Sequence, residues 1–314
     1  MKKNISVVVP VYNEEKNIHS FYSNYQQVIT TLLEKYDFEL IFVDDGSRDK
    51  TYFKILEVCE KDPRVKWISL SRNFWKEISL TAWIEWAKGD AIITLDGDGQ
   101  HPIEKFPLFL EQWEKWFEIV YHKRKTMTGA PFIKKLSSQL FYKLFNLVSE
   151  FKMEERTTDY RLLDKKVVHY FLMFTEKNRS YRWLTDWMGF RKKALLFDVH
   201  EREKWQKATY NYRKLFKLAM NSITSFSLFP LKLVWYLGIF ITFASSFLAV
   251  FIICDKFFLW NHYAFTNISV VIVFNTWIMW VVLMSLGLIA LYIANIHEEV
   301  LRRPIYIVKD KINF

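Results

Sequence analysis

Cysteine is scarce in this sequence of 314 residues, which contains only Cys59 and Cys254, one in each half. Two distant cysteines do not make a disulfide framework, and they fit a reduced, cytosolic setting for the part that folds in water. Internal repeats and low-complexity segments are also absent. The length therefore predicts one large or two modest domains.

A secretory signal is not expected at the N-terminus either. The apolar run at residues 5–9 is too short for the hydrophobic region of a signal peptide, and no cleavage site follows it. A continuous β-branched run of this length is typical of a strand that is buried on both faces. We interpret residues 5–9 as the first strand of a sheet.

Further short apolar runs follow at residues 38–43, 65–70 and 91–95, separated by segments with helical spacing of apolar residues. The first helix is expected to begin at Asn13 or Glu14 and to reach about Lys35. Such alternation predicts an α/β fold with a mostly parallel sheet and helices on both faces. One more strand is expected at 118–122, whereas 157–161 is interpreted as a polar turn before a helix.

Two acidic turns follow strands of this predicted sheet. Asp96 and Asp98 come directly after the run at 91–95, and Asp44 with Asp45 follows the run at 38–43. The carboxyl ends of parallel strands share one edge, where open α/β sheets bind ligands. Two carboxylates at i and i+2 can hold Mg²⁺ or Mn²⁺ together with substrate phosphates. The alternative interpretation of so short a motif is a solvated Asp-Gly turn.

Positive charge and long apolar runs dominate the rest of the chain. The net charge is +10, which favours an anionic substrate, a membrane surface or nucleic acid. Residues 231–253 and 268–296 each exceed the roughly 20 residues that a membrane-spanning helix needs. Their flanks are rich in Lys and Arg, so we expect a two-helix hairpin with both termini and the soluble domain in the cytoplasm.

These observations divide the chain into four segments. We expect a soluble domain at 1–199, a basic juxtamembrane helix at 200–229, the two membrane helices within 230–297, and a cytoplasmic tail at 298–314. An aromatic-rich helix is expected at 136–151, either packed in the core or lying on the membrane surface. Two helices leave no room for a wide polar pore and carry no buried charges, so a transport pathway is not expected.

Several motifs occur in a characteristic order along nearly the whole chain: VVPVYNE at 8–14, VDDGS at 43–47, LSRNF at 70–74, DGDGQHP at 96–102, DYRLLD at 159–164 and RRP at 302–304. In this order they resemble the family-two glycosyltransferases with the GT-A fold. Among these they resemble the polyprenyl-phosphate glycosyltransferases, which include dolichyl-phosphate mannose synthases and bacterial undecaprenyl-phosphate glucosyl and aminoarabinose transferases.

The resemblance implies roles for individual residues. A divalent cation, Mg²⁺ or Mn²⁺, would be held by Asp96, Asp98 and Gln100. The catalytic residues would be Asp98 and Asp159, with Asp159 orienting groups or assisting as a base. The nucleotide sugar would contact Pro10, Tyr12, Glu14, Asp44, Asp45 and Asp96. The lipid phosphate or the donor diphosphate would meet Arg124, Lys135, Ser138 and Arg202.

Two departures from the family pattern concern the phosphate contacts. Met127 stands where the family often has a second arginine, and residues 205–209 replace its usual Gly-x-Ser-Lys. These changes affect the predicted phosphate clamp more than the predicted metal site.

The function implied by the resemblance is inverting, metal-dependent transfer of a hexose or pentose from a nucleotide sugar, most simply a UDP-sugar, to a polyprenyl (undecaprenyl) phosphate. The reaction would occur at the cytoplasmic face of a bacterial inner membrane, with a multi-pass anchor, and would serve cell-envelope glycan or lipid modification. The sequence leaves open which sugar is used, the prenyl length, the pathway and whether the protein is a homo-oligomer.

Three alternatives remain in view. A processive polysaccharide synthase would carry more membrane helices and a Gln-x-x-Arg-Trp motif, whereas Arg179 here replaces the glutamine before Arg182 and Trp183. A non-catalytic membrane scaffold or nucleotide-binding regulator derived from a transferase would not need to retain Asp96, Asp98 and Asp159, all of which are present. A nucleic-acid partner is not expected, because the basic residues cluster beside the apolar segments.

Overall fold

The computed structural model describes residues 2–74, 76–124, 157–176, 180–198, 267–301 and 303–314, together with isolated positions between 236 and 251. The chain forms two compact units. One contains Met1–Tyr142, Met153–Ala208 and Arg303–Phe314, and the other contains Lys143–Lys152 and Thr209–Arg302. The first unit therefore takes in the end of the chain as well as its beginning.

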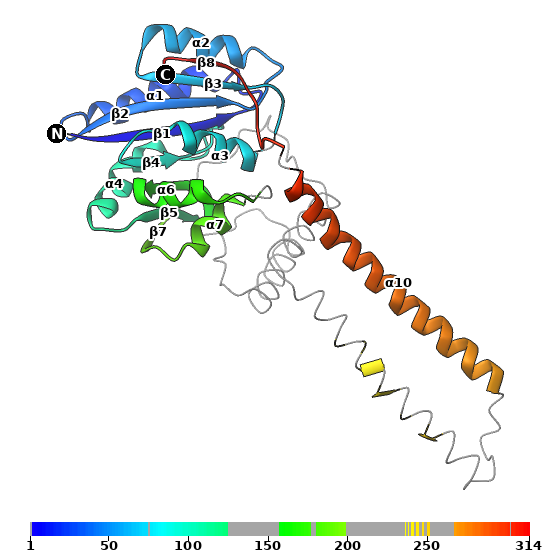
Figure 1. The fold of residues 1–314 in the computed structure, drawn as a ribbon. Helices are drawn as coiled ribbons and strands as arrows, with labels where there is room; N and C mark the ends of the chain where they lie inside the picture. The colour runs from blue at the N-terminus through cyan, green and yellow to red at the C-terminus, as the bar shows by residue number, and fades with distance from the viewer. Residues whose placement is uncertain are drawn as a thin grey trace. The chain divides into compact units, whose positions relative to one another are not determined.

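An eight-stranded sheet forms the centre of the first unit, with the strand order β7-β5-β6-β4-β1-β2-β3-β8 (Figure 1). The neighbours in β4-β1-β2-β3 run parallel, which confirms the predicted mostly parallel α/β sheet. The strands are β1 Lys3–Val11, β2 Tyr36–Asp44, β3 Val65–Leu70, β4 Ala91–Thr94, β5 Ile119–Arg124, β6 Thr157–Asp164, β7 Lys192–Phe197 and β8 Val308–Ile312.

Helices pack on both faces of this sheet, and each face has its own apolar core. The central strand shows why: Val7 and Val9 of β1 belong to one core, and Val8 between them belongs to the other. The first core includes residues of α1 Ile18–Thr30, α2 Thr51–Lys61 and α4 Phe106–Glu114, which follows the short helix η1 Ile103–Lys105. The second includes residues of α3 Lys76–Trp86, α6 Lys165–Met173 and α7 Tyr181–Trp187.

The first helix is shorter than the sequence predicts, beginning at Ile18 and ending at Thr30. Asn13 adopts a φ of 57°, outside the helical region. Its backbone N–H donates to the Ser47 hydroxyl, and the N–H of Glu14 donates to the Thr51 hydroxyl. The prediction was wrong at this end because residues 13–14 are held by the turn that follows β2, so they form a loop at the edge of the sheet.

Residues 157–161, predicted to form a polar turn, instead begin strand β6, so this prediction was wrong. β6 pairs antiparallel with both β4 and β5. Its polar groups find partners inside the fold: the Thr94 hydroxyl donates to the Asp159 carbonyl, and Arg161 Nη1 donates to the Thr185 hydroxyl. A strand can therefore be polar and buried here, because neighbouring elements satisfy its hydrogen bonds.

Arg161 is expected to be a stability residue. Its side chain is fully buried, and Nη1 lies 3.8 Å from the buried Asp186 carboxylate. Replacing Arg161 with Met removes this countercharge and leaves Asp186 with Lys192, whose Nζ lies 3.4 Å from the carboxylate, so we expect the free energy of unfolding to fall by about 1–3 kcal/mol. Urea unfolding of the full-length protein in detergent measures this change. Lys166→Ala, which removes a largely exposed partner of Glu118, is the control; equal losses in both variants would contradict the expectation.

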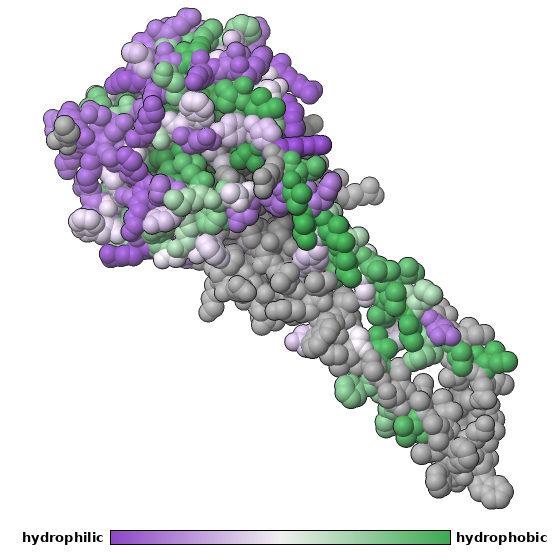
Figure 2. All heavy atoms as spheres, in the orientation of Figure 1, coloured by the Kyte–Doolittle hydropathy of each residue, from purple (hydrophilic) through white to green (hydrophobic). Residues whose placement is uncertain are grey.

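The sequence predicts a tail at 298–314. In the structure, β8 within this segment pairs antiparallel with β3 and completes the sheet. The second unit contains the helix α10 Asn267–Val300, which confirms a helix over the predicted span at 268–296. Its stretch Trp277–His297 is long and apolar enough to cross a membrane. Figure 2 shows the apolar side chains along it, many of them exposed.

The other half of the predicted hairpin, residues 231–253, is described only at isolated positions, which are helical. One apolar helix of spanning length is thus found in the described part of the chain. The predicted helices at 136–151 and within 200–229 lie outside the described residues.

Candidate functional site

The carboxyl-terminal ends of β1, β2, β3 and β4 lie in one row, because these strands are parallel. We refer to this row of strand ends as the edge of the sheet. Polar residues follow each of them: Tyr12 and Glu14 after β1, Asp45 after β2, Arg72 after β3, and Asp96 after β4. The structure thus brings the two predicted acidic turns to the same edge. This arrangement is the one in which open α/β sheets bind ligands.

Four carboxylates at this edge are close enough to influence one another. The pKa of Glu14 is raised to about 7, chiefly by burial; a hydrogen bond from the Asn17 side chain opposes this rise, and the charges of Asp98, Asp49 and Asp96 add to it. Within the described ranges no three His, Cys, Asp or Glu side chains converge as a ready metal site. Two carboxylates with further oxygen ligands from a phosphate and water are what Mg²⁺ or Mn²⁺ accepts, so Asp96 and Asp98 fit such an ion.

Glu14 is expected to make stability fall as the pH rises. Its pKa in the folded protein is about 7 against an ordinary 4.5, so the folded state holds the proton more tightly. The free energy of unfolding should therefore decrease between about pH 4.5 and 7, and Glu14→Gln should remove that part of the decrease. Unfolding in urea at pH 5 and pH 8 with EDTA tests this, with the exposed Glu34→Gln as control. Parallel pH profiles for wild type and Glu14→Gln would refute it.

The turn that carries Asp96 and Asp98 is held from three sides. Gly97 is buried, and a Cβ there would lie 2.9 Å from Cγ1 of Val11. The backbone N–H of Asp96 donates to His101 Nδ1 at 3.0 Å, and that of Gln100 donates to Asp98 Oδ1 at 3.1 Å. The turn is consequently preorganised before any ligand binds.

His101 was not predicted to belong to the site. Its ring is 4% exposed and lies 5.2 Å from the ring of Tyr160, whose hydroxyl donates to the Pro102 carbonyl. Because Nδ1 accepts a hydrogen bond from Asp96, the neutral ring carries its proton on Nε2. His101 therefore positions the acidic turn against β6, and its place in the DGDGQHP motif is the only sequence signal for this.

Asp159 is brought to the same edge by strand pairing. Thr94 at the end of β4 pairs with Arg161 of β6, so the antiparallel register points Asp159 toward the acidic turn. Both oxygens of the Asp159 carboxylate accept from one guanidinium: Arg182 Nε at 2.6 Å and Arg182 Nη2 at 2.9 Å. The carboxylate is 3% exposed. A buried carboxylate in a bidentate pair is fixed in orientation and charge-compensated.

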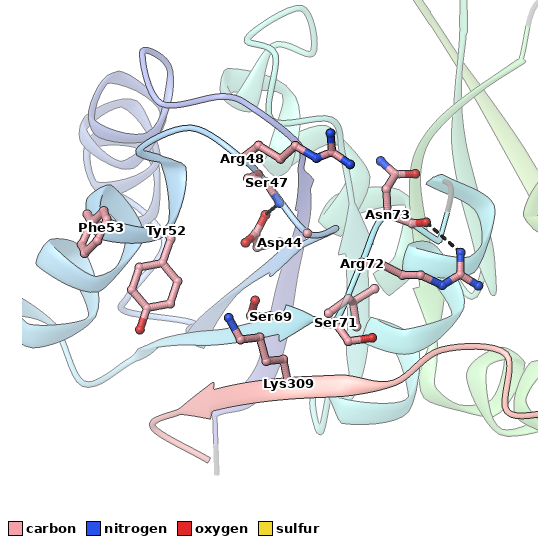
Figure 3. Close-up of a pocket in the computed structure, with 12 residues that line it drawn as sticks. Asp44, Ser47, Arg48, Tyr52, Phe53, Ser69, Ser71, Arg72, Asn73 and Lys309 are labelled. Carbon is pink, nitrogen blue, oxygen red and sulfur yellow. Dashed lines mark hydrogen bonds between the residues drawn. The ribbon is translucent and has the colours of Figure 1, made fainter.

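A pocket of about 490 Å³ opens where β2 and β3 end, between the start of α2 and strand β8 (Figure 3). Asp44 lies in it, 2% exposed, and its Oδ1 accepts from the backbone N–H of Ser47. Burial raises the pKa of Asp44. Asp45 is oriented differently, because its Oδ1 accepts from the backbone N–H of Phe74 in the loop after β3. The two neighbouring aspartates, predicted to share one nucleotide pocket, thus have different surroundings.

Gly46 allows the close approach of the two loops that form this pocket. It has a φ of 72°, and a Cβ there would lie 2.6 Å from the backbone carbonyl carbon of Arg72. A larger residue would therefore push the turn after β2 away from the loop after β3.

The remaining predicted residues divide into two groups. Arg124 ends β5, which is antiparallel to β6 and so parallel to β4, and its exposed side chain lies at the same sheet edge. Pro10 and Gln100 are half-buried, and Tyr12 is 41% exposed. Lys135, Ser138 and Arg202 lie outside the described residues, as do Met127 and the segment 205–209.

Comparison with known proteins gives consistent matches. The sequence model of "Glycosyl transferase family 2" matches residues 6–182. An uncharacterized glycosyltransferase of Synechocystis sp. is 37% identical over 307 residues, which are 98% of this chain and 95% of that protein. An SfII prophage-derived bactoprenol glucosyl transferase of Shigella flexneri is 35% identical over 306 residues, 97% of each protein.

Among solved structures, glucosyl-3-phosphoglycerate synthase from Mycobacterium tuberculosis, in complex with Mn²⁺, UDP-glucose and phosphoglyceric acid, is similar with a TM-score of 0.45. Its sequence identity is 17%, and the match covers 71% of this chain and 78% of that one.

Proposed function

This chain belongs to glycosyl transferase family 2, and we propose that it transfers a sugar from a nucleotide sugar to a polyprenyl phosphate. The observation that carries the proposal is the similarity to a bactoprenol glucosyl transferase over 97% of both proteins. Such coverage includes the apolar helix as well as the α/β unit. Glucose from UDP-glucose is therefore the first sugar and donor to test.

The donor would bind along the edge formed by β1, β2 and β4. Pro10, Tyr12, Glu14 and Asp45 would contact the nucleotide. Asp96, Asp98 and Gln100 would hold Mg²⁺ or Mn²⁺ on the diphosphate, where the ion would neutralise charge on the leaving group. The preorganised turn at Asp96 supports this assignment, because fixed ligands need no rearrangement during the reaction.

The acceptor needs little help from a base. A phosphate monoester has its second pKa near about 6, so it is mostly dianionic at neutral pH. A phosphate oxygen would attack the anomeric carbon as the bond to the diphosphate breaks, and a single displacement of this kind inverts the anomeric centre. Two anions must come together, so Arg124, Lys135, Ser138 and Arg202 are proposed to bind phosphate oxygens.

Asp159 is proposed to be a positioning residue. A carboxylate whose two oxygens accept from Arg182 at 2.6 and 2.9 Å is poorly placed to take up a proton. Its proposed task is to hold the Arg182 guanidinium in one orientation beside the acidic turn. The alternative role as an assisting base would require this pair to open.

The apolar helix fits an acceptor that lives in a bilayer. We propose that Trp277–His297 spans a bacterial inner membrane and that the α/β unit works on the cytoplasmic side, where nucleotide sugars are found. A second span within 231–253, giving a multi-pass anchor with both termini in the cytoplasm, remains part of this proposal.

The donor and the sugar are tested with purified full-length protein in detergent. Undecaprenyl phosphate, Mn²⁺ or Mg²⁺ and a panel of labelled nucleotide sugars are supplied, and the organic phase is analysed for labelled lipid. One labelled glycolipid that disappears with EDTA is the expected result. Metal-dependent binding of a nucleotide sugar without any product would instead favour a nucleotide-binding scaffold.

A further inference from the structure

Strand β8 carries an irregularity at the pocket of Figure 3. Its register pairs Ile312 with Trp67, Lys311 with Ile68, Asp310 with Ser69 and Val308 with Leu70. Lys309 is therefore the extra residue of a β-bulge. Bulges of this kind change the direction of a side chain relative to the rest of the strand.

The bulge changes which face of the sheet each side chain occupies. Ile312 packs against the core on the α1 and α2 face, and Val308 packs against the core on the α3 face. Two residues four positions apart in a regular strand would share one face. The bulge thus turns Lys309 toward the pocket, whereas Lys311 Nζ lies on the other face, 4.8 Å from the Trp86 ring.

Three cations from three distant parts of the chain surround this pocket: Arg48 before α2, Arg72 after β3, and Lys309 of β8. Figure 3 shows Lys309 reaching from β8 toward Ser69 and Tyr52, and Arg48 reaching toward Asn73. Among the described residues that line the pocket, Asp44 is the one acidic side chain. Within the described part of the chain, no ion pair includes any of the three cations. Arg72 Nη1 donates to the Asn73 carbonyl at 3.3 Å, and its guanidinium lies 4.1 Å from the Phe74 ring.

We propose that Arg48, Arg72 and Lys309 form a second anion site, which binds a phosphate group beside the residues that are proposed to hold the donor. Guanidinium groups and an ammonium are the side chains that bind phosphate oxygens most strongly. Four polar uncharged residues of the lining, Ser47, Ser69, Ser71 and Asn73, can add hydrogen bonds. The exposed ring of Phe53 and the ring of Tyr52 border the same space.

Of the residues expected to contact the nucleotide sugar, only Asp44 belongs to the described lining of this pocket. Pro10, Tyr12, Glu14, Asp96 and Asp98 do not belong to it. The turn at Ser47 lies between the two sites, because its hydroxyl accepts from the backbone N–H of Asn13 while the residue itself lines the pocket. Binding there does not depend on the divalent cation, so the inference stands or falls independently of the proposed transfer reaction.

A phosphate in this pocket would connect β8 with the turn after β2. The phosphate could be soluble, as in pyrophosphate or a nucleotide, or it could be the head group of an anionic lipid. Both share the chemistry that the three cations recognise, and the experiment below separates them.

Pocket occupancy is measured on full-length protein with Ser71→Cys as a reporter, in a Cys254→Ser background. Ser71 is exposed and lines the pocket, whereas Cys59 is buried. The rate of maleimide labelling is followed in nanodiscs with EDTA, while inorganic pyrophosphate is titrated. We expect saturable protection in phosphatidylcholine discs if the phosphate is soluble, and protection without pyrophosphate in discs containing phosphatidylglycerol if it is a lipid head group.

The variant Lys309→Ala tests the assignment. Losing one charge-assisted hydrogen bond should weaken the anion about 10-fold or more. Arg48→Ala should have a similar effect and guards against a folding defect of β8. Lys311→Ala, two residues along the same strand but on the other face, should leave the affinity unchanged. Absence of protection by either phosphate source, or equal protection in wild type and Lys309→Ala, would overturn the proposal.

Discussion

Replacing Asp98 with Asn is expected to reduce the rate of sugar transfer by about 10²–10³-fold, the loss seen when one preorganised electrostatic contact to a leaving group is removed. The substitution keeps the size of the side chain and the hydrogen bond that Oδ1 accepts from Gln100. It removes one of the two charges offered to the divalent cation. The reaction should therefore lose metal affinity as well as rate, which is measured by titrating Mn²⁺ into the transfer assay.

The matched control for this prediction is Asp90→Asn. Asp90 comes directly before the same strand, β4, and so lies at the amino-terminal ends of the parallel strands, away from the acidic turn. Its Oδ2 accepts from the backbone N–H of Asn4. Transfer by Asp90→Asn should stay within about 3-fold of wild type, because the change is remote from the acidic turn. If Asp98→Asn retained wild-type activity and Mn²⁺ dependence, the metal assignment would be wrong.

The second large effect is expected at Arg182. Replacing it with Ala leaves the Asp159 carboxylate buried without its bidentate partner, which costs about 3–5 kcal/mol of stability for a buried pair. The transfer rate should fall about 100-fold, because the groups at the edge of the sheet lose their fixed orientation. Arg182→Lys should recover part of the stability and little of the rate, since an ammonium cannot replace the planar fork.

Asp159→Asn separates positioning from base catalysis. If Asp159 positions Arg182, the variant should lower kcat at every pH without removing a limb of the pH profile. If Asp159 removes a proton in the reaction, the acidic limb of the profile should disappear together with the rate. For the Arg182 variants, the control is Arg191→Ala, which removes an exposed arginine that stacks over the Phe117 ring.

The central strands and the acidic edge could be predicted from the sequence because the signals are local. β-branched runs such as residues 5–9 specify buried strands, and each ends directly in its polar turn. The parallel arrangement then follows from the alternation of strands and helices, so Asp96 and Asp98 were placed at the correct edge without knowledge of the fold.

Strands β6 and β8 could not be predicted, because their positions depend on distant parts of the chain. β6 contains Thr157, Thr158, Asp159 and Arg161, whose polar groups are acceptable in the interior only because β4 and α7 supply partners. β8 has the sequence VKDKI, and charged residues are typical of an edge strand that avoids further pairing. Neither shows a hydrophobic pattern that favours a strand over a turn or tail.

The same distinction applies to the site. Asp96, Asp98 and Glu14 belong to recognisable motifs, whereas Arg182 acquires its role by meeting Asp159, 23 residues earlier in the chain. Lys309 enters a pocket formed by residues 44–73 because a bulge directs it there. Spacing in the sequence contains no signal for either contact, since both are made by tertiary packing.

The central claim is most directly tested by transfer of radiolabelled glucose from UDP-glucose to undecaprenyl phosphate by the purified full-length protein with Mn²⁺. The account predicts a labelled lipid that requires the acceptor phosphate, disappears with EDTA and is at least about 100-fold slower to form with Asp98→Asn. Labelled lipid formed equally well by Asp98→Asn, or formed equally from undecaprenol without its phosphate, would contradict it.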